Sequence, residues 1–173
     1  MSIQRLSQPQ NLDDLFLYAL SRLLASAGGR VIRLCEGEFG ITRREWRFLA
    51  LLAESDGILS SALAASAQLD RARTSRTLSG LVTKQLITRT PRTNDRRKVA
   101  IHLTPQGRAL HDALFPRIVE INQELLSVLD PGQVQALETM LVSLQTRANT
   151  MAQDRSGPAA DRRRGGRARP ALG

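Results

Sequence analysis

Apolar residues recur every three or four positions near the start of the chain. Between residues 12 and 34 they have the spacing of one helix face: Leu12, Phe16, Leu20, Leu23 and Ala27. Residues 36–40, Glu-Gly-Glu-Phe-Gly, interrupt this pattern. Thr42, followed three positions later by Glu45, has the spacing of a capping box, so a second helix is expected to begin there.

Two short helices and two strands are predicted next. Residues 60–69 and 70–86 have helical patterns, and Asp70 is the expected N-cap of the second helix. Residues 99–103, Val-Ala-Ile-His-Leu, alternate with period two, and Ile87 marks a preceding strand. Residues 91–95 contain Pro, Asn and Asp and predict a turn between the strands. This order of elements is typical of a winged helix-turn-helix.

Long helices are predicted in the last part of the chain. Thr104 followed by Pro105 is a strong helix start, and this helix should run to about residue 128. Asp130 and Pro131 begin another helix in the same way, with a heptad-like apolar seam that requires a partner helix. The seam consists of Val134, Leu137, Leu141, Leu144, Ala148 and Met151. Residues 154–173 are rich in Gly, Pro and Arg, so we expect a disordered basic tail there.

The charge of the chain indicates its class of partner. The 173 residues carry a formal net charge of +9, which favours a polyanionic partner, either nucleic acid or an acidic membrane surface, although a basic surface can serve solubility alone. The single cysteine, Cys35, excludes an intramolecular disulfide. The sequence has neither an apolar signal core nor an apolar run of about 18 residues, so we expect a cytoplasmic protein without membrane contact.

Charged and polar residues gather on one side of the predicted helix 70–86. A helical wheel places Leu78, Leu81, Val82 and Leu86 on one side, and Arg73, Arg76, Thr77, Gly80 and Lys84 on the other. Glycine inside a helix is unfavourable by about 1 kcal/mol relative to alanine, so another surface is expected to approach this glycine closely. The hairpin at 92–98 adds four cations and one Asp, and cations so close repel one another unless an anion lies nearby. We expect the helix to contact base edges and the hairpin to contact the backbone or minor groove of DNA.

Residues 93–108, TNDRRKVAIHLTPQGR, resemble the wing signature of the MarR family of transcription regulators. The strongest match is Asp95-Arg96-Arg97 together with Leu103-Thr104 and a glycine in the next helix start. Residues 61–89 resemble the helix-turn-helix of that family in length and register, and the whole resemblance spans roughly residues 12–151. One departure is Gln85, where many members have glycine before the strand.

The resemblance implies a mainly α protein, a winged helix-turn-helix with a helical dimerisation region and a small β-hairpin wing. Residues 1–40 would form an N-terminal dimerisation helix, 41–104 the DNA-binding domain, 105–152 the C-terminal dimerisation helices and 153–173 the basic tail. The implied functional unit is a homodimer on a palindromic double-stranded operator. The residues expected to contact DNA are Arg71, Arg73, Thr74, Ser75, Arg76, Thr77, Lys84, Arg92, Asp95, Arg96, Arg97 and Lys98, with Arg97 in the minor groove.

Many members of the MarR family bind a small phenolic or aromatic acid between the dimerisation helices and the winged domain. The resemblance makes Tyr18, Arg22, Trp46, Arg47 and His111 the candidate effector residues, and Arg47 would suit a carboxylate. The alternative interpretation is that Trp46 belongs to the core and Arg47 is an exposed salt-bridge partner. We therefore expect a repressor that a small aromatic acid releases from DNA.

The sequence is compatible with three other functions. One is a thiol-based redox regulator acting through Cys35, against which a structurally inert cysteine is the alternative. Another is an architectural DNA-binding protein without sequence preference. The third is a helical enzyme or protein-interaction module, which would not bind an operator. His102 and His111 lack the spacing of a metal site, and neither a Ser-His-Asp arrangement nor a Gly-rich phosphate loop is present, so no metal, cofactor or enzymatic activity is predicted.

Overall fold

The computed structural model describes residues 5–67, 70–92 and 95–153, and it describes residues 92 and 95–98 through their backbone alone. The chain divides into two compact units, one that ends at Leu125 and one that begins at Leu126. The predicted tail at 154–173 lies outside the described residues.

The first unit begins with a short 3-10 turn, Leu12–Asp14, which is followed by α1 (Phe16–Arg33) and a π turn, Leu34–Glu38. The prediction of one continuous helix from residue 12 is wrong, because the backbone of Leu15 is extended between the 3-10 turn and α1. The side chain of Asn11 caps the turn by accepting a hydrogen bond from the backbone N–H of Asp13 at 3.0 Å. This cap stabilises a separate turn ahead of α1.

Helix α2 (Arg43–Glu54) begins at the predicted capping box. The Thr42 hydroxyl accepts a hydrogen bond from the backbone N–H of Glu45 at 3.1 Å, and the Glu45 carboxylate accepts one from the backbone N–H of Thr42 at 2.7 Å. Two backbone donors at the helix start are satisfied in this way. The residues of the box thus fix where α2 begins.

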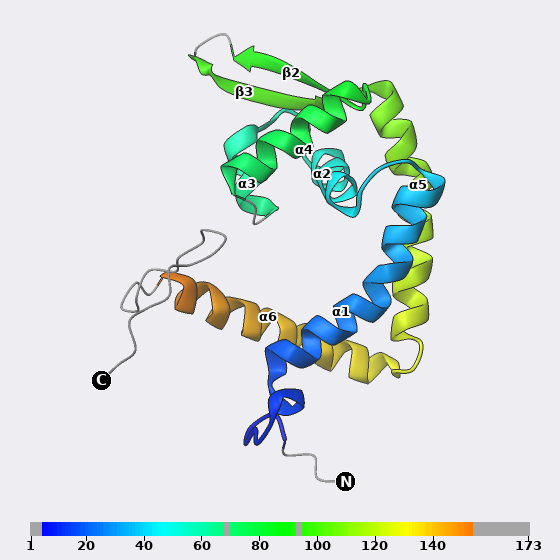
Figure 1. Ribbon diagram of the computed structural model, residues 1–173, viewed down its shortest axis with the longest axis vertical. Helices are drawn as coiled ribbons and strands as arrows, with labels where there is room; N and C mark the ends of the chain where they lie inside the picture. Colours follow the sequence, from blue (N-terminus) through cyan, green and yellow to red (C-terminus); the bar gives the residue numbers. More distant parts are fainter. Residues whose placement is uncertain (1–4, 68–69, 93–94, 154–173) are drawn as a thin grey trace, which may run out of the picture. The chain divides into compact units, whose positions relative to one another are not determined.

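The winged helix-turn-helix follows, as predicted. It consists of β1 (Ile58–Leu59), α3 (Ser60–Ser66), α4 (Arg71–Thr83), β2 (Ile87–Arg92) and β3 (Asp95–Leu103). The strands form an antiparallel sheet in the order β1–β3–β2, with Ile58 opposite Ile101 and Ile87 opposite Leu103. In Figure 1 the β2–β3 hairpin lies next to α4. Strand β1 was not predicted, and its two residues pair with β3.

The hydrophobic core of this unit surrounds α2, which lies among the other elements in Figure 1. Fully buried side chains come from α2 and from the π turn, α3, α4, β3 and α5: Cys35, Phe48, Leu49, Leu52, Leu63, Leu81, Ile101 and Leu114. Aliphatic side chains dominate this core, as a chain with 3% aromatic residues requires. Burial of such side chains contributes roughly 1.5–3 kcal/mol each, so the core fixes how α4 and the sheet sit on α2.

Helix α5 (Pro105–Leu126) lies beside α1 in Figure 1. Val31 of α1 and Ile118 and Ile121 of α5 pack against the core. Arg30 forms an ion pair with Glu124, and Arg117 forms one with Glu38 at 3.2 Å. The remaining face of α1 carries several exposed leucines, among them Leu17 at 78% exposure.

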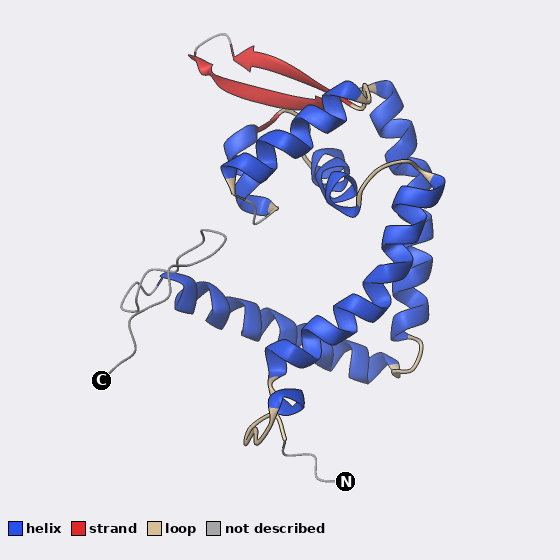
Figure 2. Cartoon of the chain, viewed as in Figure 1, coloured by secondary structure: helices blue, strands red, loops and turns tan. Residues whose placement is uncertain are grey.

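The second unit contains α6 (Pro131–Gln153), which Figure 2 shows as one uninterrupted helix. It begins with a reciprocal cap, in which Asp130 Oδ1 accepts from the backbone N–H of Gln133 at 2.9 Å and Gln133 Oε1 accepts from that of Asp130 at 3.0 Å. No residue between Pro131 and Gln153 is buried. The predicted apolar seam of α6 is therefore present but uncovered in the single chain.

Candidate nucleic-acid interface

Helix α4 begins where the sequence predicts. The carboxylate of Asp70 accepts a hydrogen bond from the backbone N–H of Arg73 at 2.8 Å, which caps the first turn. This hydrogen bond, together with the charges of Arg73 and Arg76, holds the pKa of Asp70 below its usual value. The cap fixes the helix end that carries the predicted base-contacting residues.

Four of the predicted DNA-contacting residues of α4 are exposed: Arg71, Arg73, Ser75 and Arg76. The expectation that Thr74 and Thr77 also face outward is wrong, because they are 3% and 8% exposed. The buried stripe of α4 runs through Thr74, Thr77, Leu78 and Leu81, while Val82 is 39% exposed. The helical wheel was aligned on the apolar residues and therefore centred the buried face too near Val82 and too far from Thr77. Threonine can pack its methyl group inward, so it can belong to the buried face.

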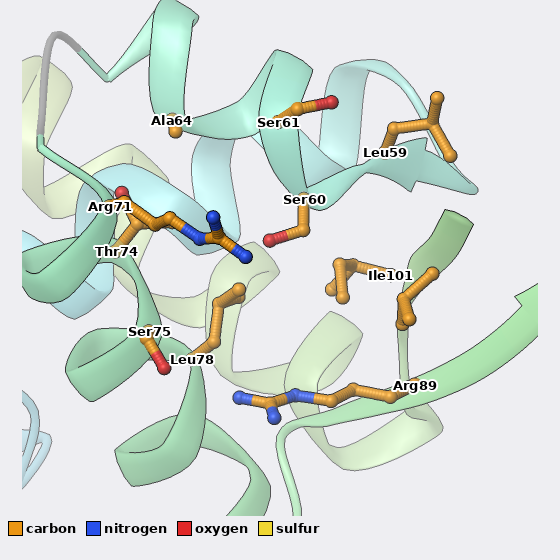
Figure 3. Close-up of a pocket in the computed structure, with 11 residues that line it drawn as sticks. Leu59, Ser60, Ser61, Ala64, Arg71, Thr74, Ser75, Leu78, Arg89 and Ile101 are labelled. Atoms are coloured by element: carbon orange, nitrogen blue, oxygen red, sulfur yellow. The ribbon is translucent and has the colours of Figure 1, made fainter. Parts of the chain in front are cut away.

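A pocket of about 590 Å³ opens between α3, α4 and the sheet. Figure 3 shows the guanidinium ends of Arg71 and Arg89 pointing into this pocket, with that of Arg71 near the hydroxyl of Ser60 and that of Arg89 on the side of Leu78. Among the described residues, the Thr74 hydroxyl is buried there without a hydrogen-bond partner. Two cations and hydroxyl groups around one concave surface suit an anionic group such as a phosphate.

Arg89 was missed by the sequence analysis. Strand side chains alternate, so Arg89 lies on the same face of β2 as the buried Ile87, which could have indicated that it turns toward α4. Its guanidinium donates a hydrogen bond to the hydroxyl of Ser79 at 3.3 Å. The strand thus places a cation beside the polar side of α4.

Lys84 is exposed, as a predicted DNA contact should be, and it also has partners within the chain. Its ammonium group donates to Glu45 Oε2 at 2.8 Å and to the carbonyl oxygen of Gly40 at 2.8 Å. The close approach expected at Gly80 exists, but the neighbour is Glu45 of the same chain, since a Cβ at Gly80 would lie 2.9 Å from Glu45 Oε1. Gly80 and the ammonium group of Lys84 therefore contact α2, although the Lys84 side chain is still exposed to solvent.

The wing carries the remaining predicted DNA contacts. Its backbone pairs Arg92 with Asp95, and the register shifts between Pro91 and Arg92. The predicted contacts Arg92, Asp95, Arg96, Arg97 and Lys98 have side chains outside the described part of the structure. Their roles stay predictions.

The predicted effector residues are brought together only in part. Trp46 is buried and stacks on His111 with ring centroids 5.5 Å apart. Phe115, which the sequence analysis missed, lies 5.5 Å from His111 and 6.3 Å from Trp46, so the three rings form one cluster. Helical spacing is the signal that was overlooked, since positions 111 and 115 share one face of α5. Arg47 is exposed and donates to the carbonyl oxygen of Ala67 at 3.4 Å.

The two candidates on α1 have other surroundings. Arg22 forms an exposed ion pair with Asp13 at 2.9 Å. Tyr18 is half-buried, and its backbone carbonyl accepts a hydrogen bond from the Ser21 hydroxyl at 2.8 Å. Neither residue lines the pocket beside α4.

Cys35 has the environment of an unreactive thiol. It is fully buried, and burial, followed by the neighbouring charge of Glu36, raises the pKa of the thiol, with Arg43 opposing this effect. Reactive thiols require a lowered pKa and access to solvent. Within the described ranges, no group of His, Cys, Asp and Glu side chains is suitable for a metal ion, and no helix there is both long and apolar enough to cross a membrane.

Comparisons with known proteins agree with this architecture. Residues 41–99 match the MarR family model. A homoprotocatechuate degradative operon repressor from Escherichia coli is 28% identical over 121 residues, which cover 68% of this chain and 79% of that protein. A probable transcriptional regulator from Pseudomonas aeruginosa has 26% identity and a TM-score of 0.67 over 78% of this chain and 99% of that one. The S. aureus MepR structure, solved with DNA, has 24% identity and a TM-score of 0.72 over 77% and 98% of the two chains.

Proposed function

Since the chain belongs to the MarR family of DNA-binding transcription regulators, we propose that it is a homodimeric repressor that a small aromatic acid releases from a palindromic operator. The observation that carries this proposal is the polar side of α4, where Arg71, Ser75 and Arg76 are exposed. Helix α4 would enter the major groove with its capped end toward the bases. The wing would contact the adjoining backbone or minor groove.

The pocket beside α4 extends this interface. Arg71 and Arg89 point into it, and a backbone phosphate held there would be in contact with α4 and the sheet at once. Such contacts carry no sequence information but set the register of the protein on the duplex. Arg89 and Ser60 are therefore added to the predicted DNA contacts.

The homodimer is supported by two apolar surfaces that the single chain leaves uncovered. Helix α1 exposes Leu17, Leu20, Leu23 and Leu24, and helix α6 exposes Met140, Leu141, Val142, Leu144 and Met151. Apolar surfaces this extensive are rare in monomers. Sedimentation equilibrium is expected to give a dimer in dilute solution, and a monomer there would contradict this part of the proposal.

An effector site is supported by the aromatic cluster of Trp46, His111 and Phe115. Phe115 is 48% exposed, so its ring offers an accessible surface on which a flat aromatic acid would pack. The effector must bind more tightly to a dimer whose α4 helices no longer match the operator, because equal affinity for both states shifts nothing. Phe115→Ala is expected to weaken release by effective acids while leaving DNA affinity unchanged.

The decisive experiment compares operator with random DNA. An operator duplex is first selected from a random pool by the wild-type protein, and binding to it and to a scrambled duplex of equal length is then measured by fluorescence anisotropy. Arg73→Ala and Arg76→Ala are each expected to reduce the preference for the selected duplex by about 5- to 100-fold, as for one lost base contact. Arg44→Ala, which removes an exposed cation from α2, is the matched control and should preserve the preference.

An architectural DNA-binding protein predicts a different outcome. The pool would then give no preferred sequence, and the α4 variants would weaken binding to both duplexes by equal factors. A panel of aromatic acids added to the wild-type complex completes the test. Failure of every acid in a broad panel to release the selected duplex would contradict the effector part alone.

A further inference from the structure

The C-terminal end of α4 is attached to the first turn of α2 by a buried carboxylate. Glu45 is 6% exposed, and its Oε2 accepts both the backbone N–H of Thr42 at 2.7 Å and the ammonium group of Lys84 at 2.8 Å. The same ammonium group donates to the carbonyl oxygen of Gly40 at 2.8 Å. One lysine thus connects α4 to the segment that enters α2.

The glycine in α4 makes this connection possible. A Cβ at Gly80 would lie 2.9 Å from Glu45 Oε1, and the other carboxylate oxygen is already held by Thr42 and Lys84. The carboxylate therefore cannot turn away from a larger residue without losing hydrogen bonds. Glycine is unfavourable in the middle of a helix, so its presence here is explained by the space that Glu45 requires.

The attachment reaches α1 as well. Arg43, in the same turn of α2, lies over Gly28 of α1, where a Cβ would be 2.8 Å from Arg43 Nη1. Gly28 is the one buried residue of α1, among Phe16–Arg33. The first turn of α2 is thus in contact with α1 on one side and with the end of α4 on the other.

The attachment lies at one end of α4 and Arg71 lies at the other, so a small rotation at Lys84 displaces Arg71. The helix has 13 residues, and at a rise of about 1.5 Å per residue its two ends are about 18 Å apart. A rotation of about 5° at the Lys84 end would move the Arg71 end by about 1.5 Å. A displacement of that size is enough to weaken hydrogen bonds to base edges, which require donor–acceptor distances near 3 Å.

We propose that Glu45 and Lys84 are positioning residues for DNA recognition: their ion pair, given room by Gly80, sets the orientation of α4 on the duplex. Lys84 then determines sequence preference without contacting DNA. This inference rests on the proposed function, in which α4 reads the operator. It assigns to Lys84 a role different from that of a phosphate-contacting lysine.

The two roles of Lys84 predict different dependences on salt. A phosphate contact contributes to binding of any sequence, and its removal lowers the slope of log Kd against log salt by about one. A positioning residue leaves that slope unchanged and affects the selected duplex more than a scrambled one. Measuring the salt slope together with the sequence preference therefore distinguishes a positioning role from a phosphate contact and from a general loss of structure.

The experiment uses the full chain with Lys84→Met, Lys84→Arg, Glu45→Gln and the double variant Glu45→Gln/Lys84→Met. Glutamine at 45 keeps an acceptor for the capping box but removes the charge. Each protein is titrated with the selected and the scrambled duplex over a range of salt concentrations, and circular dichroism establishes that it is folded. Lys84→Met is expected to reduce the preference by about tenfold at an unchanged salt slope, and Lys84→Arg should restore most of it.

The double variant tests whether Glu45 and Lys84 act through the same interaction. Because both residues act through one ion pair, the loss in the double variant should be no larger than that in Lys84→Met alone. A uniform loss on both duplexes with a reduced salt slope, or an unchanged preference in Lys84→Met and Glu45→Gln alike, would overturn the proposal. Absence of any preferred sequence for the wild-type protein would instead contradict the proposed function, so the two failures are distinguishable.

Discussion

Gly107 lies directly against the carbonyl oxygen of Leu86: a Cβ at position 107 would be 2.0 Å from that oxygen. The contact joins the first turn of α5 to the residue between α4 and β2. The backbone N–H of Thr104 donates to the same carbonyl at 3.1 Å, and the Thr104 hydroxyl accepts from the N–H of Gly107 at 2.9 Å. Three segments of the winged domain therefore meet at one glycine.

Gly107→Ala is expected to destabilise the protein strongly. Backbone atoms cannot give way as a flexible side chain can, so we expect the free energy of unfolding to fall by about 3 kcal/mol, as for severe overpacking. Urea denaturation measures this value. The matched control is Gly29→Ala in α1, where the nearest atom is Arg33 Nη1 at 3.7 Å and the change should be neutral or stabilising. Similar losses in the two variants would contradict the assignment.

Gln85→Gly is expected to stabilise the protein. Gln85 has a φ of 58°, in the left-handed region that favours glycine, at the end of α4. The hydrogen bonds Leu86 N–H to Leu81 O, at 3.0 Å, and Gln85 N–H to Val82 O, at 2.9 Å, complete a Schellman motif around it. Glycine should raise the free energy of unfolding by about 1 kcal/mol, measured by thermal denaturation. Gln85→Ala keeps the Cβ and should show no such gain, so equal gains in both variants would count against backbone strain.

Cys35 is expected to be inert in the folded protein. Because burial raises the pKa of its thiol, the folded state disfavours the thiolate, and iodoacetamide at neutral pH should label the native chain far more slowly than the urea-unfolded chain. The stability that the neutral thiol contributes is complete below the ordinary pKa of 9.0 and is lost as pH rises through the folded pKa. Compared with Cys35→Ser, the wild type should therefore lose stability only above about pH 9. Equal labelling of folded and unfolded chains would restore the redox hypothesis.

The sequence predicted those elements whose signals are local. Thr42 with Glu45, Asp70, and Thr104 with Pro105 each begin a helix as expected, since a cap depends only on residues within one turn. The interruption at Leu15 was missed because the leucine spacing continues across it. Strand β1 was missed for a different reason: two residues have no periodicity, and they form a strand only by pairing with β3.

The sequence predicted the exposure of residues that are charged, but it did not predict which residues are covered by neighbouring helices. Arg71, Arg73 and Arg76 are exposed as expected. Thr74 is buried, and Lys84 is held by Glu45, because α2 and α3 contact α4 on sides that a helical wheel cannot distinguish. Strand alternation places Arg89 on the same face as Ile87, but the distance of that face from α4 is set only by the packing of β2. Tertiary contacts, not local preference, decided these positions.

The contact between Gly80 and Glu45 predicts that Gly80→Ala lowers stability in the wild type but raises it when Glu45 is absent. In the wild type, Gly80→Ala would bring a methyl group within 2.9 Å of Glu45 Oε1, and we expect a loss of about 1 kcal/mol in the free energy of unfolding despite the better helix propensity of alanine. In Glu45→Ala the obstacle is gone, so the same substitution should add about 1 kcal/mol. The coupling between the two positions would then be about 2 kcal/mol, which urea denaturation of the four proteins resolves. Gains of equal size in both backgrounds would mean that Glu45 moves aside freely, and the glycine would then need another explanation.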